Sequence, residues 1–118
     1  MYHVNRSVAV IKPKQPFFDW LKSTPDWDLD LTLDNLRVDC TALLIPEFDE
    51  PENAVSYIDD RFEQIFEMEL SSWYEDKKLW PARRDLQTFW EWFEVELHSV
   101  VVDVPDEDIN ETSIGVLH

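Results

Sequence analysis

Carboxylates are the most abundant chemistry-bearing side chains in this chain, and one run of them has the spacing of calcium ligands. Asp26, Asp28 and Asp30 alternate as they do at the start of an EF-hand loop. The pattern then fails, because Leu31 stands where that loop requires glycine and Arg37 where it requires a bidentate glutamate. The run is therefore interpreted as a solvated acidic loop.

A second constellation lies in the expected last strand, where Glu94, Glu96 and His98 would project from one face at the strand period of two. A histidine beside carboxylates can be a metal ligand or a general base. The other two histidines, His3 and His118, stand at the ends of the chain, so a closed zinc site lacks ligands. A small enzyme or metal-binding domain centred on this face is one hypothesis; a plain solvent-facing strand is the favoured interpretation.

Cys40 is the only cysteine, so no intrachain disulfide can form. It alternates with Ala42 and Leu44 in an apolar run, which favours core packing over a role as nucleophile. The N-terminal residues show no charged stretch followed by a long apolar run. The expectation is a cytoplasmic protein with no membrane segment.

Glycine is almost absent, with Gly115 as its single occurrence, where a chain of this size would hold about eight. Loops that cradle phosphate need glycine for close approach of the backbone. The sequence therefore excludes Walker and dinucleotide-binding loops, and no cofactor is predicted.

The chain carries 26 acidic and 10 basic residues, a formal net charge of −16, and the acids are concentrated. Residues 25–76 hold sixteen acids against two arginines, and residues 85–118 hold nine acids with no lysine or arginine. Solubility needs a net charge of only about 2–8. Such a surface repels nucleic acid and attracts a basic protein.

The basic exception is Lys77–Arg84, which has Trp80 in its middle. Cations and aromatics together are typical of binding surfaces. The preferred alternative is that these cations neutralise the acidic body from within, by pairing with Glu69, Glu75 and Asp76.

At 118 residues the chain is expected to form one α+β domain over residues 1–104, followed by an acidic, frayed tail at 105–118. The predicted architecture is a three-stranded mixed sheet with helices packed on it, and Ser113–Leu117 would make a fourth strand. The order is strand, helix, short helix, strand, helix, helix, strand. The expected strands are Val4–Ile11, Cys40–Ile45 and Glu94–Val104. The second of these is expected to be central in the sheet, and the third to have a bulge near His98. Helices are expected at Gln15–Ser23, after Thr32, from Pro51 to about Trp73 with Asp49 as its cap, and after Asp85.

Aromatic residues make up 14% of the chain, including six tryptophans, which predicts a large aromatic core. Trp27 and Trp92 fall outside the expected apolar stripes of the helices. Each is either an exposed contact residue or a sign that a stripe is misdrawn.

The leading hypothesis is a non-enzymatic module that docks a basic protein, for example an inhibitor or immunity protein that covers the cationic site of a nuclease. In being small, acidic, aromatic-rich and of mixed strand and helix order, the chain resembles barstar-type inhibitors in physical type, with no shared motif. A homodimer with an exposed patch at Trp27, Trp73 or Trp92 is the third hypothesis. The candidate partner-binding residues are Asp26, Trp27, Asp28, Glu47, Asp49 and Glu50.

Overall fold

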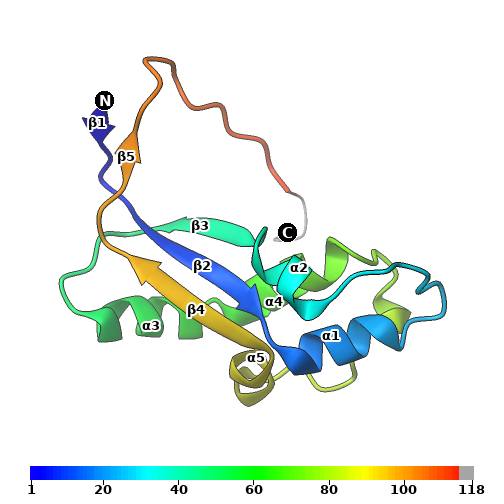
Figure 1. Cartoon of the computed structure of the whole chain (residues 1–118). Helices are drawn as coiled ribbons and strands as arrows, with labels where there is room; N and C mark the ends of the chain where they lie inside the picture. The colour runs from blue at the N-terminus through cyan, green and yellow to red at the C-terminus, as the bar shows by residue number, and fades with distance from the viewer. Residues whose placement is uncertain (115–118) are drawn as a thin grey trace.

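The computed structural model describes residues 1–114 and is built on a three-stranded sheet with strand order β3-β2-β4 (Figure 1). The strands are β2 (Ser7–Pro13), β3 (Thr41–Ile45) and β4 (Phe93–His98). Both outer strands run antiparallel to β2, so the sheet is antiparallel where the sequence suggested a mixed one. The α+β class, with three strands and helices packed on them, is confirmed.

The position of the second strand in the sheet was predicted wrongly. The central strand is β2, whose residues alternate between fully and partly buried, and β3 lies at an edge. The apolar side chains of Ala42 and Leu44 suggested burial on both faces. They face solvent instead, and Leu44 is 57% exposed.

The last predicted strand is divided between two sheets. β4 ends at His98, and the chain resumes as β5 (Val102–Asp103), which pairs antiparallel with β1 (Tyr2–His3). The shift of apolar parity after Leu97, interpreted from the sequence as a bulge, marks this change of sheet. β1 and β5 form a small ribbon that projects from the body (Figure 1).

Two short helices follow β2. The first, α1 (Gln15–Lys22), has Pro16 in its first turn, where a missing N–H breaks no helical hydrogen bond. The second, α2 (Leu33–Arg37), begins at Thr32 as predicted. The Thr32 hydroxyl accepts from the Asn35 amide, and the Asn35 side chain accepts from the Thr32 amide, a reciprocal capping box.

The long helix expected from Pro51 to about Trp73 is two helices, α3 (Pro51–Asp59) and α4 (Phe62–Ser71). The chain leaves the helical path at Arg61, and no glycine or proline marks the break in the sequence. Asp49 was also wrong as the cap. Glu50 occupies the N-cap position, and its side chain makes no capping hydrogen bond.

A single 3-10 turn, η1 (Lys77–Leu79), precedes α5 (Leu86–Trp92), which begins at Asp85 as predicted. The Asp85 carboxylate accepts hydrogen bonds from the amide and the hydroxyl of Thr88, at 2.8 and 2.7 Å. These bonds, with one from Arg83, lower the pKa of Asp85 to about 2. α5 then passes directly into β4, because Phe93 is both the residue after the helix and the first of the strand.

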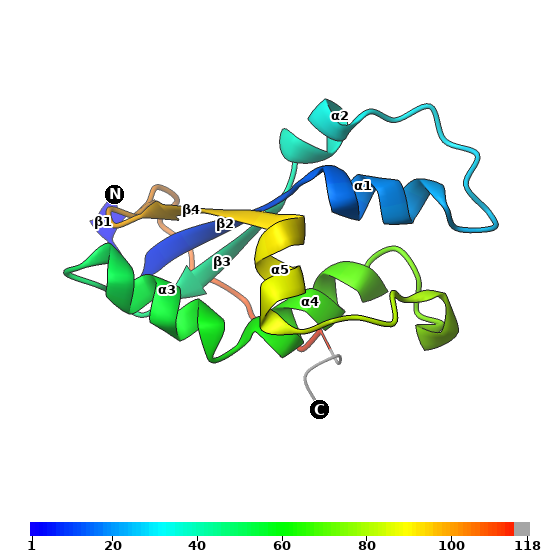
Figure 2. The same cartoon turned by 90° about the horizontal axis from the view of Figure 1, so that it is seen from below.

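Helices α3, α4 and α5 cover one face of the sheet, and α2 lies on the opposite side, at the end of β2, leaving most of that face open (Figure 2). Ala9, Ile11 and Ile45 of the sheet point into the covered side and are almost completely buried. α1 continues beyond the end of β2 and extends the core away from the sheet. None of the helices within residues 1–114 is long and apolar enough to cross a membrane.

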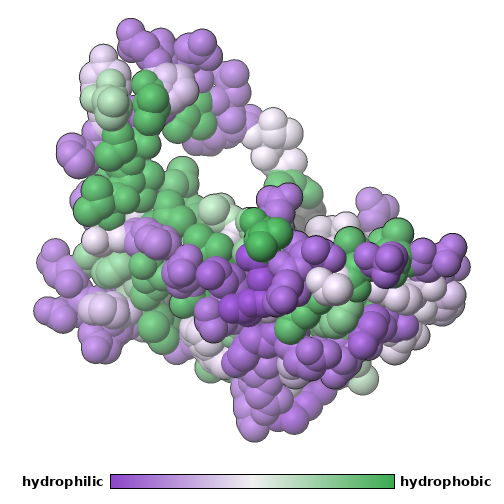
Figure 3. Space-filling view, in the orientation of Figure 1, coloured by the Kyte–Doolittle hydropathy of each residue, from purple (hydrophilic) through white to green (hydrophobic). Residues whose placement is uncertain are grey.

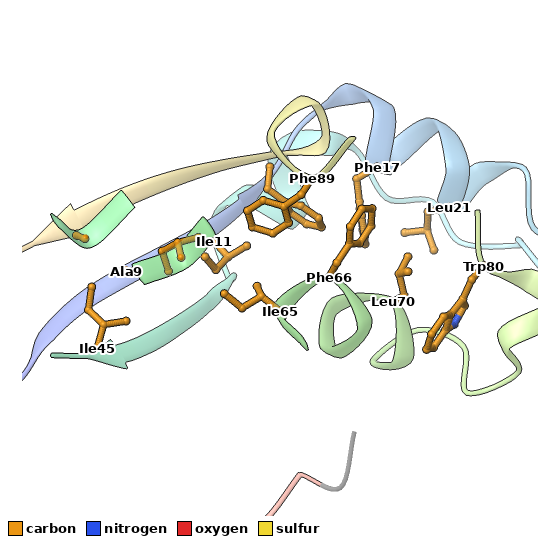
Figure 4. Packing of buried hydrophobic residues seen from close by; sticks show 13 residues of the cluster. Ala9, Ile11, Phe17, Leu21, Ile45, Ile65, Phe66, Leu70, Trp80 and Phe89 are labelled. Carbon is orange, nitrogen blue, oxygen red and sulfur yellow. The ribbon is translucent and has the colours of Figure 1, made fainter. Parts of the chain in front are cut away.

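Aromatic rings fill the space between sheet and helices (Figure 4). The ring of Phe93 lies 5.3–5.5 Å, centroid to centroid, from the rings of Phe17, Phe66 and Phe89. All four side chains are at most 2% exposed. They come from α1, α4, α5 and β4, so this one cluster joins the helices to the sheet.

The acidic tail has no helix or strand from Val104 to Ile114 and forms an arch that stands away from the body (Figures 1 and 3). At its described end, Ile114 lines a groove between β3 and the α3–α4 pair, together with Leu44 and Met68. The fourth strand predicted for Ser113–Leu117 is not formed at Ser113 and Ile114, and its remaining residues lie outside the described part of the chain.

The central cluster should dominate stability. Replacing Phe66 by alanine is expected to lower the free energy of unfolding by about 3–5 kcal/mol, because a ring at the centre of a packed core leaves a cavity. Phe62 on the same helix is only half-buried, so Phe62→Ala is the matched control and should cost clearly less. Urea unfolding followed by tryptophan fluorescence measures both. Equal losses for the two variants would contradict the central role of Phe66.

Candidate functional site

A pocket of about 200 Å³ lies where β2, α1, α2, β3 and α4 meet. β2 contributes Pro13, the segment after α2 contributes Asp39 and Cys40, and the C-terminal end of α4 contributes Glu69 and Trp73. Phe17 and Leu36 add apolar walls, and Thr41 and Ser72 add hydroxyls. The pocket thus combines an apolar lining with several polar groups, which is the usual make-up of a binding site.

Glu69 is the least expected residue of this pocket. Its carboxyl group is largely buried, and burial raises its pKa, an effect that the Thr41 hydroxyl partly opposes by hydrogen bonding. One carboxyl oxygen, Oε1, is shielded from solvent and has no hydrogen-bond partner within residues 1–114. Most buried polar groups have a partner, so an acceptor without one is a candidate for a functional role.

Sequence reasoning missed Glu69 as a site residue, although a signal was present. Glu69 stands four residues after Ile65 and four before Trp73, on the stripe of the helix that faces inward. A carboxylate on a buried stripe is rarer than one on a solvated face. The sequence suggested that Glu69 forms an ion pair with the basic cluster Lys77–Arg84. Within residues 1–114, however, no cation lies within 4.0 Å of its carboxylate.

Cys40 lies at the wall of the pocket and is half-buried. Its thiol donates a hydrogen bond to the carbonyl oxygen of Arg37, with Sγ 3.1 Å from the acceptor. Burial raises the pKa of the thiol, with Lys12 acting in the opposite direction and Glu69 in the same direction. The raised pKa disfavours the thiolate that a nucleophile needs. The core position predicted for Cys40 is not observed, because the residue is half-buried at the pocket wall.

Trp73 differs from the other five tryptophans in the part of the chain that the structure describes. Each of the others pairs with an aromatic ring or lies under a cation, whereas Trp73 does neither. Trp20, Trp80 and Trp90 donate their indole N–H to oxygen atoms, and within residues 1–114 no such bond is found for Trp73. Trp73 is half-buried and packs against the core, and the part of its side chain that lines the pocket meets no aromatic ring or cation of residues 1–114.

The six predicted partner-binding residues do not form one surface. Asp26, Trp27 and Asp28 lie in the loop between α1 and α2, at one end of the molecule (Figures 1 and 2). The other three lie in the turn between β3 and α3, at the opposite end. We call the exposed carboxylates Asp26, Asp28 and Asp30 the first acidic end, and Glu47, Asp49 and Glu50 the second acidic end.

The two tryptophans that fell outside the predicted stripes are both half-buried parts of the aromatic core. The ring of Trp27 packs edge-on against Phe18, with centroids 6.0 Å apart. The ring of Trp92 lies against Phe17, Trp20 and Phe66. The stripes were misdrawn in both cases, and neither tryptophan is a free, exposed anchor.

The negative charge is only slightly neutralised within the molecule. Of the 26 acids, all in residues 1–114, only Asp19, Asp85, Glu94 and Glu96 have a cationic side chain within 4.0 Å among the described residues. Most of the remaining carboxylates are exposed. Their mutual repulsion is a standing cost that a cationic partner would relieve.

The basic cluster Lys77–Arg84 does contact its own chain, but not through the acids that were predicted. Lys77 and Arg84 lie over the ring of Trp80, at 5.7 and 5.5 Å from its centroid. Arg83 pairs with Asp85 at 2.9 Å. These cations are therefore used to cover a buried tryptophan and to fix the start of α5.

Glu94, Glu96 and His98 alternate along β4 with the inward-facing residues, on the face away from α3, α4 and α5, and all three are exposed. His98 Nε2 and Lys12 Nζ contact the Glu96 carboxylate at 3.1 and 3.3 Å, and these contacts lower its pKa. Glu94 pairs separately with Arg37 at 3.3 Å. The described residues contain no group of three or more metal-ligating side chains. The geometry is that of a solvated strand face with ion pairs across it.

Exposed apolar side chains gather on the β1–β5 ribbon and the chain beside it. Val100 and Val104 are 70% and 63% exposed, and Tyr2 and Val102 are exposed next to them. Figure 3 shows hydrophobic residues along this projecting part and across the uncovered face of the sheet. Such a patch is typical of a surface that contacts another protein.

Comparison of the chain with protein-family models, with curated proteins and with solved structures finds no match. The function is therefore argued from the geometry of the molecule alone.

Glu69 should weaken the fold at neutral pH. Its pKa is raised in the folded state, so ionisation between the unfolded and folded pKa values costs native stability as pH rises above about 4.5. Glu69→Gln removes this cost and is expected to raise the melting temperature at pH 7, with a smaller gain at pH 4. Glu67→Gln on the same helix is the control, because Glu67 does not line the pocket. A melting temperature that falls equally at both pH values would contradict a destabilising carboxylate.

Proposed function

We propose that this chain is a non-enzymatic, cytoplasmic protein-binding module that docks a basic protein partner through its acidic surface. The observation that carries the proposal is that most of the 26 carboxylates are exposed and lack a cationic partner within residues 1–114. Surfaces of one sign speed the encounter with a partner of the opposite sign and select against others.

The use of the cations supports the same proposal. Lys12 and Arg37 pair across the open sheet face, Lys77 and Arg84 cover Trp80, and Arg83 fixes the start of α5. Cations that hold the fold together are not paired with the carboxylates of the two acidic ends. The electrostatic potential at these ends therefore remains negative, as the net charge of −16 implies.

The first acidic end is the better docking surface of the two. Asp26, Asp28 and Asp30 are exposed, and Trp27 between them is anchored against Phe18, so the loop is held in place. A pre-organised loop loses less conformational entropy on binding. The pocket between α2 and α4 lies in the same half of the molecule (Figure 1).

A nuclease or another protein with a cationic active site is the concrete partner class for this surface. Such a site is built to hold phosphates and presents clustered arginine and lysine side chains. An acidic surface of matching size can cover it, as an inhibitor or immunity protein does.

The docking proposal is tested by affinity capture of lysate proteins on the immobilised chain, at about 0.05 M and at about 0.5 M salt. Because added salt shortens the range of charge interactions, a basic partner retained at low salt should be lost at high salt. The triple variant Asp26→Asn, Asp28→Asn, Asp30→Asn should lower its association rate at least about tenfold. Recovery of no basic protein, or of one that salt does not release, would overturn the proposal.

Two matched triple variants locate the surface. Glu47→Gln, Asp49→Asn and Glu50→Gln remove the same charge from the second acidic end, and Asp106→Asn, Glu107→Gln and Asp108→Asn remove it from the tail. If the first acidic end is the docking surface, both variants keep most of the association rate. Equal losses in all three variants would show a non-specific charge effect.

Self-association is the second candidate, favoured by the exposed apolar residues of the β1–β5 ribbon. If this patch is a dimer interface, light scattering should give a concentration-dependent dimer mass that Val104→Asp reduces to that of a monomer, because a buried unpaired charge is costly. Val38, which is also exposed but lies elsewhere, gives the control variant Val38→Asp. A monomer at high concentration would exclude this candidate.

A further inference from the structure

One oxygen of the acidic group in the pocket at the end of α4 has no hydrogen-bond partner within residues 1–114. Glu69 lines the pocket, and this oxygen is its Oε1. A buried, unpaired acceptor lowers stability, so its presence is better explained by a ligand than by the fold. The absent group must be a hydrogen-bond donor, and for a carboxylate the strongest donors are cations.

Three further features of the pocket favour a cation. Trp73 lines it, and among the described residues its ring faces no other aromatic ring or cation. Cations bind to the face of a tryptophan ring. The pocket also lies at the C-terminal end of the ten-residue helix α4, where the helix dipole is negative. Asp39 adds an exposed carboxylate at the rim, which would attract a cation before it enters.

The two cations nearest to the pocket are already engaged. Arg37 donates to the carbonyl oxygen of Pro13 at 2.9 Å and pairs with Glu94 at 3.3 Å. Lys12 pairs with Glu96 at 3.3 Å. Within residues 1–114 neither forms an ion pair with Glu69, so a cation from another molecule would meet no competing cation there.

The size of the pocket restricts the ligand. Its volume of about 200 Å³ is below the roughly 300–1,000 Å³ of pockets that enclose drug-sized ligands. The apolar walls, formed by Pro13, Phe17 and Leu36, suit an aliphatic stem. An arginine or lysine side chain has both parts, an apolar stem and a charged end.

We propose that this pocket is the anchor site for one arginine or lysine side chain of the basic partner, with its stem against Phe17 and Leu36, its charge on Glu69 and the face of Trp73. Because Oε1 is shielded from solvent, the carboxylate turns toward the cavity when the side chain enters. The source of the side chain rests on the proposed function, but the cation site itself does not. Anchors of this kind contribute much of the binding energy of an interface.

The site is tested with small probes in place of the unidentified partner. N-acetyl-arginine methylamide is titrated into the ¹⁵N-labelled chain while the six tryptophan indole N–H signals are followed by NMR. We expect the Trp73 signal, assigned from Trp73→Phe, to shift in a saturable way. N-acetyl-citrulline methylamide has nearly the same shape without the charge. Its affinity, measured from the same Trp73 signal, should be at least about tenfold lower.

Glu69→Gln should lower the affinity of the arginine probe at least about tenfold, because it removes the negative charge and leaves the shape of the pocket unchanged. Glu67→Gln, on the same helix but outside the pocket lining, should leave binding unchanged. Glu69→Gln retains a polar side chain of the same size, and its fold is verified from the indole spectrum. Equal binding of citrulline, an unchanged affinity in Glu69→Gln, or equal shifts at all six indoles would overturn the inference.

The probe titration and the capture experiment together separate the cation site from the docking of a basic protein. Salt-sensitive capture of a basic protein, with no saturable probe binding at Trp73, would overturn the anchor site alone. Saturable, Glu69-dependent probe binding, with no basic protein captured at low salt, would support the cation site and overturn the docking of a basic protein.

Discussion

The packing of aromatic rings against the covered face of the sheet is the interaction on which the rest of this structure depends. Phe93 begins β4, yet its ring contacts rings from α1, α4 and α5. Each element is short, and α2 and α5 have only five and seven residues, far too few to be stable alone. α5 contributes Phe89 to the shared cluster, and α2 packs the half-buried Leu36 against the core. A large aromatic core thus compensates for short elements.

The same core explains why the surface can carry so much charge of one sign. A net charge of −16 on 118 residues opposes the compact state through self-repulsion. The cations that could offset it are placed for local structure, over Trp80 or at the start of α5. The fold therefore relies on apolar burial for stability and leaves its electrostatic field to act outward. Neutralising the surface would be the simpler solution if stability were the only demand on it.

Local chemistry predicted the parts of the fold that local chemistry determines. Thr32 and Asp85 cap helices as expected, because a cap needs only a side chain and an amide within the next three residues. The break at Arg61 and the edge position of β3 escaped prediction, since both depend on contacts between distant segments. Ala42 and Leu44 were assigned to burial because they are apolar, but on their side of the sheet the structure has only α2, which lies at the end of β2.

The candidate site was harder to predict than the fold for a related reason. The six candidate partner-binding residues were named as one set, but α1, α2 and β3 place residues 26–28 far from residues 47–50 (Figure 1). The pocket combines residues from β2, the end of α2 and the end of α4, which no sequence spacing brings together. Of the pocket residues, only Glu69 could have been noticed in the sequence, because it is a carboxylate on the inward-facing stripe of a helix.

Glu69 shows how a departure from good packing can indicate function. A glutamine or methionine would fit the same position without a buried charge, and a solvent-facing glutamate would cost nothing. The chain instead places a carboxyl beside a half-buried thiol, an indole with no ring partner and the negative end of a helix. Each of these neighbours makes the ionised form less stable or the site more attractive to a cation. An arrangement that disfavours its own anion and has no counter-charge within residues 1–114 gains stability as an anion when another molecule supplies that charge.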